Sequence, residues 1–155
     1  MKLGDFSSLA KNYNRYRVGY SDKVLDSIIS LLDMKMEKAD VVDIGAGTGI
    51  WTRMLEEKNP QTIHAVEPNN EMLKFGKKLS KDTKIIWNYG TGEKTNLKNY
   101  SVDLVTMASS FHWVNFDVAC KEFYRILRKN GILAVLWNPR IIEKNKKLND
   151  LEKYI

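Results

Sequence analysis

Short apolar runs alternate with amphipathic stretches along most of the chain. The apolar runs suit buried strands and cover 41–44, 62–66, 84–88, 102–107 and 132–137. Between them, apolar residues recur at helical spacing in 70–79 and in 117–128. Strands that alternate with helices predict a parallel sheet with helices on both faces. The expected fold class is therefore α/β.

The expected helices carry signals at their ends. Ser21 is suited to cap a helix whose apolar stripe runs from Val24 to Leu32 and packs on the sheet. Asn130 and Gly131 follow the last apolar stripe, so we expect the helix over 117–128 to stop there. Basic residues near that stop would face the negative end of the helix dipole.

A glycine-rich loop follows the first apolar run. The run ends in an acid, and Gly45, Gly47 and Gly49 then occupy alternate positions. Glycine has no Cβ, so such a loop lets a ligand approach the backbone closely. The next helix would direct free N–H groups and its positive dipole end toward the loop, which favours a polar or anionic ligand. The pattern therefore predicts a nucleotide-type site.

The glycine spacing and one acid bear on which nucleotide binds. Ile50 stands where the third glycine of G-x-G-x-x-G belongs, which disfavours a nicotinamide dinucleotide. Glu67 lies twenty residues after Gly47 at the end of the second run, where a carboxylate accepts hydrogen bonds from ribose hydroxyls. Both cofactor classes use such an acid, so Glu67 alone leaves the choice open.

Five sequence blocks decide between these classes because they occur in one order along nearly the whole chain: 41–49, 65–69, 90–93, 101–113 and 123–137. Together they resemble the class I S-adenosylmethionine (SAM)-dependent methyltransferases, specifically the broad type 11 group, whose members act on small acids and other small molecules. The resemblance implies a Rossmann-like doubly wound sheet of about five parallel strands in the order 3-2-1-4-5. It also implies SAM as cofactor, S-adenosyl-L-homocysteine as product, and direct displacement by an O or N atom of a small-molecule acceptor.

The resemblance assigns a partner to each part of the cofactor. The glycine loop and Asp43 would hold the amino-acid end, and Glu67 would accept from the ribose hydroxyls. Residues 91–93 would meet the adenine edge, and Arg17, in a segment that folds over the cofactor in the family, would pair with the methionyl carboxylate. The candidate cofactor-binding residues are Arg17, Asp43, Gly45, Ala46, Gly47, Thr48, Glu67, Pro68, Thr91, Gly92, Glu93 and Ser109.

Structural roles stay open for several of these side chains. Asp43 suits a helix cap or a loop brace, Glu93 a brace of its own loop, and Arg17 a solvent-exposed position. The block 109–113 falls at the carboxyl end of the fourth strand, where open α/β sheets place ligands. Within it, His112 is the candidate catalytic residue, either as general base for a hydroxyl acceptor or as a side chain that orients the loop. A carboxylate or a neutral amine acceptor needs no base.

Composition bounds the class of protein. With 155 residues, 43% hydrophobic and 28% charged, the chain suits one globular domain. No apolar run approaches the roughly 20 residues that span a bilayer, and the N-terminus lacks an apolar signal core, so we expect a cytoplasmic protein without membrane contact. Cys120 is the single cysteine, which excludes an internal disulfide and a thiolate metal cluster, and we expect no metal site. The net charge of +6 comes mostly from lysines scattered among acids, which does not favour nucleic-acid binding.

We expect a single SAM-binding domain over 1–155, with an N-terminal lid and helix in 1–35, a cofactor-binding core in 40–138 and a terminal helix in 139–155. Members of the family continue into an antiparallel hairpin, for which this chain has no residues. The fifth run would then be an unpaired apolar edge. We therefore expect either a piece of a longer protein or self-association through this edge. The alternative to an active methyltransferase is a SAM-binding module or fragment without methyl-transfer activity.

Overall fold

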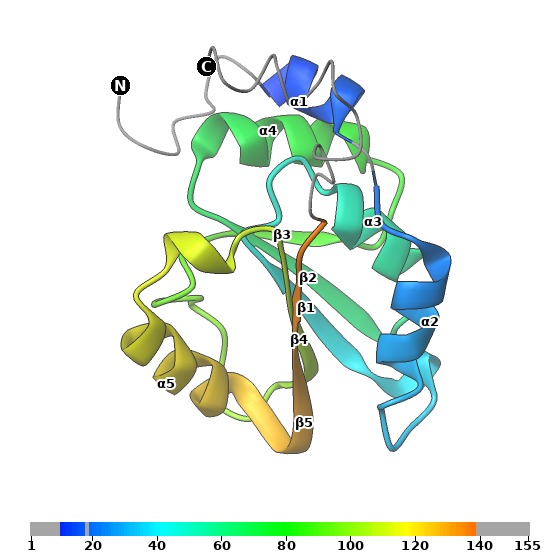
Figure 1. The fold of residues 1–155 in the computed structure, drawn as a ribbon, viewed down its shortest axis with the longest axis vertical. Helices are drawn as coiled ribbons and strands as arrows, with labels where there is room; N and C mark the ends of the chain where they lie inside the picture. Colours follow the sequence, from blue (N-terminus) through cyan, green and yellow to red (C-terminus); the bar gives the residue numbers. More distant parts are fainter. Residues whose placement is uncertain (1–9, 18, 139–155) are drawn as a thin grey trace, which may run out of the picture.

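The computed structural model of the chain describes residues 10–17 and 19–138. Figure 1 shows a twisted central sheet flanked by helices. The strands are β1 (Asp40–Ile44), β2 (Thr62–Glu67), β3 (Ile86–Tyr89), β4 (Val102–Ala108) and β5 (Leu127–Leu136). The helices are α1 (Ala10–Tyr16), α2 (Asp22–Ile29), α3 (Ile50–Glu56), α4 (Asn70–Leu79) and α5 (Phe116–Ile126), with the 3-10 turns η1 (Met36–Lys38) and η2 (Phe111–Trp113). The terminal helix predicted for 139–155 and the start of the predicted lid lie outside the described residues.

The sheet consists of five parallel strands in the order β3-β2-β1-β4-β5, which confirms the predicted fold class and strand order. Each face of the sheet has its own apolar core. Leu25 of α2 and Leu55 of α3 are buried against one face, and Phe123 and Ile126 of α5 are buried against the other. The two covered faces leave the carboxyl ends of the strands as the accessible edge for a ligand.

The junction between α5 and β5 differs from the prediction. The helix ends at Ile126 and β5 begins at once with Leu127, so Asn130 and Gly131 do not stop the helix. Asn130 instead has a φ of 63° inside β5, where the pairing register with β4 shifts. An Asn-Gly pair suits left-handed backbone in a bulged strand as well as at a helix end. Leu127, which the local signals assigned to the helix, therefore pairs with Val102 in the sheet instead.

Arg128, expected at the helix end, instead joins three strands at the amino end of the sheet. Its Nη1 donates to Asp103 Oδ2 at 2.6 Å, and its Nη2 donates to Asp40 Oδ2 at 2.7 Å. Both aspartates are buried. The backbone N–H of Asp40 also donates to Asp103 Oδ2 at 2.9 Å. The cluster ties β5 to β4 and β1 at the end of the sheet opposite the candidate site.

We expect Arg128→Met to lower the free energy of unfolding by about 1–3 kcal/mol at neutral pH, because it leaves two buried carboxylates without their cation. The loss should stay below that of a fully buried ion pair, since the Arg128 side chain is 39% exposed. Urea denaturation followed by circular dichroism measures the effect. Lys129→Met, at an exposed neighbouring position, is the matched control. Equal stabilities of the two variants would contradict a stabilising role for the cluster.

Two further features of the described residues concern membranes and metals. Within residues 10–17 and 19–138, no helix has the length and apolar character required to cross a bilayer. The same part of the chain contains no group of three or more His, Cys, Asp or Glu side chains placed to hold a metal ion.

Candidate functional site

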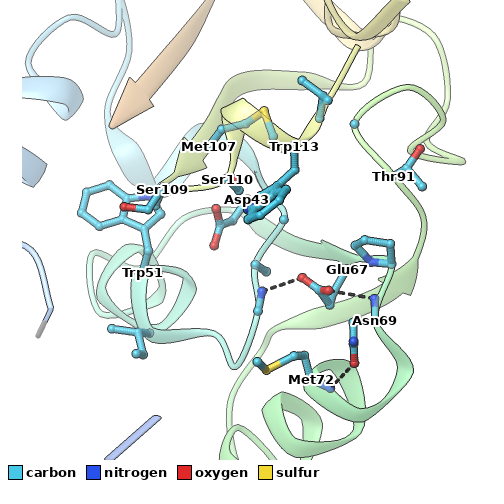
Figure 2. A pocket seen from close by; sticks show the side chains of 18 of the residues that line it. Asp43, Trp51, Glu67, Asn69, Met72, Thr91, Met107, Ser109, Ser110 and Trp113 are labelled. Carbon is cyan, nitrogen blue, oxygen red and sulfur yellow. Dashed lines mark hydrogen bonds between the residues drawn. The ribbon is translucent and has the colours of Figure 1, made fainter. Parts of the chain in front are cut away.

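A cavity of about 330 Å³ lies at the carboxyl ends of β1, β2 and β4 (Figure 2). The glycine loop after β1, the turn after β2 and residues 91–93 form part of its wall. The end of β4, the residues that follow it, and the N-terminal segment with Arg17 and Tyr20 complete the wall. Open parallel sheets bind ligands at this edge. The sequence motifs therefore converge on one space.

Two glycines of the loop are required for different reasons. Gly45 has a φ of 70° and packs directly on Ser110, so that a Cβ on Gly45 would lie 2.5 Å from the Ser110 Cβ. Gly47 has a φ of 59°, and a Cβ there would meet no atom within 4 Å. Because Gly47 lines the cavity, a side chain at this position would occupy ligand space. Gly47 thus forms a cradle in which a ligand can contact the backbone.

Glu67, the last residue of β2, connects two loops of the cavity wall. Its Oε2 accepts a hydrogen bond from the Gly47 backbone N–H at 2.7 Å, and its Oε1 accepts one from the Asn69 backbone N–H at 2.8 Å. Figure 2 shows both bonds converging on the carboxylate. Burial raises the pKa of Glu67, and the two backbone hydrogen bonds offset part of the rise. The carboxylate therefore fixes the glycine loop, and each oxygen keeps a second lone pair for a ligand.

Asp43 is the second-last residue of β1, and two hydroxyl groups hold its carboxylate. Thr52 Oγ1 donates to one carboxylate oxygen at 2.6 Å, and Thr106 Oγ1 lies 3.2 Å from the other. Burial raises the pKa of Asp43 from 3.8 to about 7, although the bonds from the two threonines lower it in part. The loop-brace role left open by the sequence is thus present in the structure. Asp43 also lines the cavity, so the brace and a ligand contact are compatible.

The N-terminal segment closes one side of the cavity through long-range hydrogen bonds. The Tyr20 hydroxyl lies 2.6 Å from Ser109 Oγ, which follows β4. Asn14 Oδ1 accepts from Thr48 Oγ1 at 3.2 Å and from Arg53 Nη2 at 3.3 Å, which fastens α1 to the glycine loop. Residues far apart in the sequence are therefore brought together around the cavity.

Most of the predicted cofactor-binding residues line this cavity. They are Arg17, Asp43, Gly45, Ala46, Gly47, Glu67, Pro68, Thr91, Gly92, Glu93 and Ser109. Thr48 is fully buried behind the loop, with its side chain on Asn14, and does not line the cavity. His112 also lies outside the cavity wall, and its ring packs on those of Trp113 and Trp137 at centroid distances of 4.5 and 4.6 Å. The geometry therefore gives no support to a side-chain contact with the cofactor for Thr48 or to a general-base role for His112.

The cavity wall also contains residues that the sequence did not single out as ligands. They are Tyr20, Ile50, Trp51, Asn69, Met107, Ala108 and Val114. Trp51 falls on the apolar stripe of α3, where periodicity assigns it to the core. It is indeed buried, yet its Nε1 has no hydrogen-bond partner among the described residues. Its position two residues after Gly49 was the one available signal.

Glu93 braces its own loop, which is the structural role that the sequence left open. Its Oε1 accepts from the Asn115 backbone N–H at 2.7 Å, which joins residues 91–93 to the start of α5. Hydrogen bonds from the Asn115 and Glu93 backbones and from Thr91 lower the pKa of Glu93 against the opposing effect of burial. The side chain is therefore a brace that also borders the cavity.

Comparison with known proteins places this geometry in a family. The family model described as a methyltransferase domain matches residues 42–135, which include the glycine loop, Glu67, all of β2, β3 and β4, and most of β1 and β5. The chain belongs to this methyltransferase family. The match confirms the resemblance inferred from the five sequence blocks.

Individual relatives agree with the methyltransferase assignment. An uncharacterized methyltransferase-like protein of Schizosaccharomyces pombe is 36% identical over 125 residues, which cover 81% of this chain and 46% of that protein. A putative methyltransferase of Dictyostelium discoideum is 34% identical, with coverages of 86% and 48%. The chain thus spans about half the length of the curated relatives that it matches.

A solved structure shares the fold of the methyltransferase domain. The putative S-adenosyl-L-methionine-dependent methyltransferase of Methanococcus maripaludis superposes with a TM-score of 0.73 at 20% identity, covering 96% of this chain and 71% of that one. At this identity the similarity shows the Rossmann-like fold, and the role of each site residue rests on the geometry described above.

Proposed function

We propose that this chain binds SAM in the cavity and transfers its methyl group, by direct displacement, to an O or N atom of a small-molecule acceptor. The observation that carries the proposal is the buried Glu67 carboxylate beside the open cradle at Gly47. A nucleoside needs a hydrogen-bond acceptor for its ribose hydroxyls and close access to backbone. Both are present at adjacent strand ends.

The residues of the cavity fit the chemical groups of SAM. Glu67 has a free lone pair on each oxygen for the ribose hydroxyls, and the 91–93 loop borders the space for the adenine. Asp43, oriented by Thr52 and Thr106, offers a carboxylate to the ammonium group. When bound, SAM supplies an electrophilic methyl group on a sulfonium. The chain's own task is then to align an acceptor and to exclude water, and alignment alone lowers barriers by roughly 7–11 kcal/mol in favourable cases.

The names of two relatives indicate which acceptor atoms proteins similar to this chain methylate. A malonyl-[acyl-carrier protein] O-methyltransferase of Acetivibrio thermocellus is 26% identical over 132 residues. A possible histamine N-methyltransferase of Thermotoga maritima is 28% identical, with a TM-score of 0.64. These names support transfer to either O or N. Because His112 does not line the cavity, acceptors that need no base, such as carboxylates and neutral amines, fit the wall better than hydroxyls do.

A second candidate is a SAM-binding module without methyl transfer. The chain spans about half the length of the curated relatives that it matches, and the residues that fit SAM do not by themselves make an acceptor site. Binding and turnover separate the two candidates.

Calorimetry with S-adenosylhomocysteine and with NAD tests the cofactor class. Micromolar binding of S-adenosylhomocysteine without NAD binding is expected, and the reverse result would overturn both candidates. Methyl incorporation from labelled SAM into a panel of small carboxylates, phenols and amines then tests transfer. Binding without any incorporation would favour the module.

The pH dependence of binding should report the ionisation of Asp43. Its carboxylate pairs with the ligand's ammonium only when ionised, and its pKa is raised to about 7 in the folded chain. Affinity for S-adenosylhomocysteine should therefore rise about tenfold per pH unit from pH ~5 to pH ~7 and then level off. Calorimetry across this range measures it.

The matched control is 5′-methylthioadenosine, which keeps the adenosine but lacks the ammonium and should show no such rise. Parallel pH profiles for the two ligands would contradict the Asp43 contact. The ligand-free protein should show the opposite trend. Because its raised pKa keeps Asp43 protonated when the unfolded carboxyl, with a pKa of 3.8, is already ionised, stability should fall as the pH rises from about 4 to about 7.

We propose further that the chain self-associates through β5. Within the described residues this strand pairs with β4 alone. Leu133 and Val135 lie on one face of the strand and are 37% and 44% exposed, and Trp137, which follows the strand, is 55% exposed. Unpaired strand edges with apolar side chains favour pairing with another chain.

Light scattering across a concentration series should show a mass that rises with concentration. Val135→Lys, at a partly exposed position, should shift the equilibrium toward the monomer. A mass equal to that of one chain at every concentration would exclude this association.

A further inference from the structure

One buried donor in the cavity wall has no hydrogen-bond partner among the described residues. Trp51 is 2% exposed, and its Nε1 is shielded from water without an acceptor among the described residues. Buried N–H groups are nearly always satisfied, because an unmade hydrogen bond destabilises the fold. Trp87 provides the contrast, since its Nε1 donates to Ser80 Oγ at 2.8 Å. An unsatisfied donor in a wall residue points to a group that the cavity receives.

The neighbours of Trp51 are also hydrogen-bonding groups. The ring of Tyr20 packs edge-on against the indole, with centroids 5.2 Å apart, and the Tyr20 hydroxyl lies 2.6 Å from Ser109 Oγ. One of these two hydroxyls donates to the other, so one O–H remains to donate elsewhere. Figure 2 shows Trp51 and Ser109 on one side of Asp43, with Glu67 on the opposite side. Tyr20, Trp51 and Ser109 together form what we call the donor corner.

We propose that the donor corner binds a carboxylate group, with Trp51 Nε1 donating to one of its oxygens. This inference rests on the proposed function, since it places a carboxylate beside a bound SAM or within it. The indole N–H donates and cannot accept, and the free hydroxyl proton adds a second donor. Arg17 lines the same cavity and adds positive charge. Asp43 lines the same cavity, so the ammonium of the same or a neighbouring ligand can pair with it.

The carboxylate has two possible sources, the methionyl end of the cofactor and a carboxylate acceptor. In the second case the carboxylate oxygen forms the new bond to the methyl carbon. The carbon–sulfur bond breaks with its electron pair on sulfur, and a methyl ester and a neutral thioether result. No proton moves, so no base is required.

The indole resonances of the full chain provide a direct test. The chain has four tryptophans, and Trp51→Phe identifies the Nε1–H signal of Trp51 in a spectrum of the ¹⁵N-labelled protein. We expect that signal to move downfield and to exchange more slowly when the carboxylate binds. A shift with S-adenosylhomocysteine but not with 5′-methylthioadenosine assigns the carboxylate to the cofactor. A shift only when succinate or benzoate is added to the S-adenosylhomocysteine complex assigns it to the acceptor.

Binding constants give the second measurement. If the cofactor supplies the carboxylate, Trp51→Phe should weaken S-adenosylhomocysteine roughly tenfold or more and leave 5′-methylthioadenosine unchanged, because only the former carries the group. Trp87→Phe, outside the cavity wall, is the matched control and should change neither constant. Thermal unfolding of each variant checks that the fold is retained.

Two results would overturn the inference while leaving the proposed function intact. The first is a Trp51 signal that stays in place with S-adenosylhomocysteine and with both added carboxylates. The second is an equal loss of affinity for both nucleosides in Trp51→Phe, which would mark a packing role. Failure of the wild-type chain to bind S-adenosylhomocysteine at all would instead reject the proposed function.

Discussion

Glu67→Ala should weaken the binding of S-adenosylhomocysteine by about 2–4 kcal/mol. The substitution removes the acceptor for the ribose hydroxyls, and charge-assisted hydrogen bonds contribute roughly 1.5–3 kcal/mol each. It also releases the backbone N–H groups of Gly47 and Asn69, which the carboxylate holds at 2.7 and 2.8 Å. The glycine loop then loses the anchor that positions its cradle. Calorimetry measures the dissociation constant.

The choice of ligand separates this effect from that of the donor corner. 5′-Methylthioadenosine keeps the ribose, so Glu67→Ala should weaken both nucleosides by similar factors. Glu67→Gln retains one acceptor oxygen and should fall between Ala and the wild type. Glu71→Ala, which removes an exposed carboxylate paired with Lys74, should change nothing. An unchanged dissociation constant in Glu67→Ala would contradict the assignment of the ribose to this end of β2.

The positions of β1 and β2 followed from the local pattern because each strand is short and apolar, whereas the order of the strands was implied by the family resemblance. Residues 41–44 and 62–66 were expected as strands, and β1 and β2 occupy Asp40–Ile44 and Thr62–Glu67. Their side chains are buried almost throughout because helices cover both faces of the sheet. For such strands, the local pattern and the tertiary environment favour the same structure.

The start of β5 shows where local signals are insufficient. Leu127 and Arg128 continue the helical periodicity of α5, and Asn130-Gly131 suits a helix stop. What decides between helix and strand is distant in sequence: Leu127 pairs with Val102, and Arg128 bonds Asp40 and Asp103. A single sequence does not show that two buried carboxylates lie at that end of the sheet.

The same limit applies within the site. Glu67 and Gly47 were predicted as ligand-binding residues because such residues stand at a fixed spacing from a strand end, and both line the cavity. Trp51 was hidden because an aromatic residue on a helical stripe is ordinarily a core residue, and its unpaired Nε1 is visible only in three dimensions. His112 was a candidate general base by residue type and block, with a loop-orienting role as the alternative, and in the structure its ring packs on those of two tryptophans. The residue type predicts which reactions a side chain could perform. The direction in which that side chain points is known only from the folded structure.

Gly47→Val should reduce the affinity for S-adenosylhomocysteine by more than about 3 kcal/mol, which is roughly a hundredfold or greater. A Cβ at this position would meet no protein atom within 4 Å, so the branched side chain projects into the cavity that Gly47 lines. Calorimetry measures the loss, and thermal unfolding of the ligand-free variant reports on the fold. The effect should reach 5′-methylthioadenosine as well, because the cradle lies beside the carboxylate assigned to the ribose.

Backbone strain must be separated from loss of space in this experiment. The φ of 59° at Gly47 is unfavourable for valine, so that Gly47→Val also destabilises the loop. Gly47→Asn resolves the two effects, since asparagine tolerates left-handed backbone but still fills the cradle. Loss of binding in both variants, with near-native stability in Gly47→Asn, supports a ligand at the cradle. Gly45→Ala should behave differently: its Cβ would overlap Ser110 at 2.5 Å, so its main effect should be on stability. If Gly47→Asn bound S-adenosylhomocysteine as tightly as the wild type, the nucleoside would have to bind away from this loop.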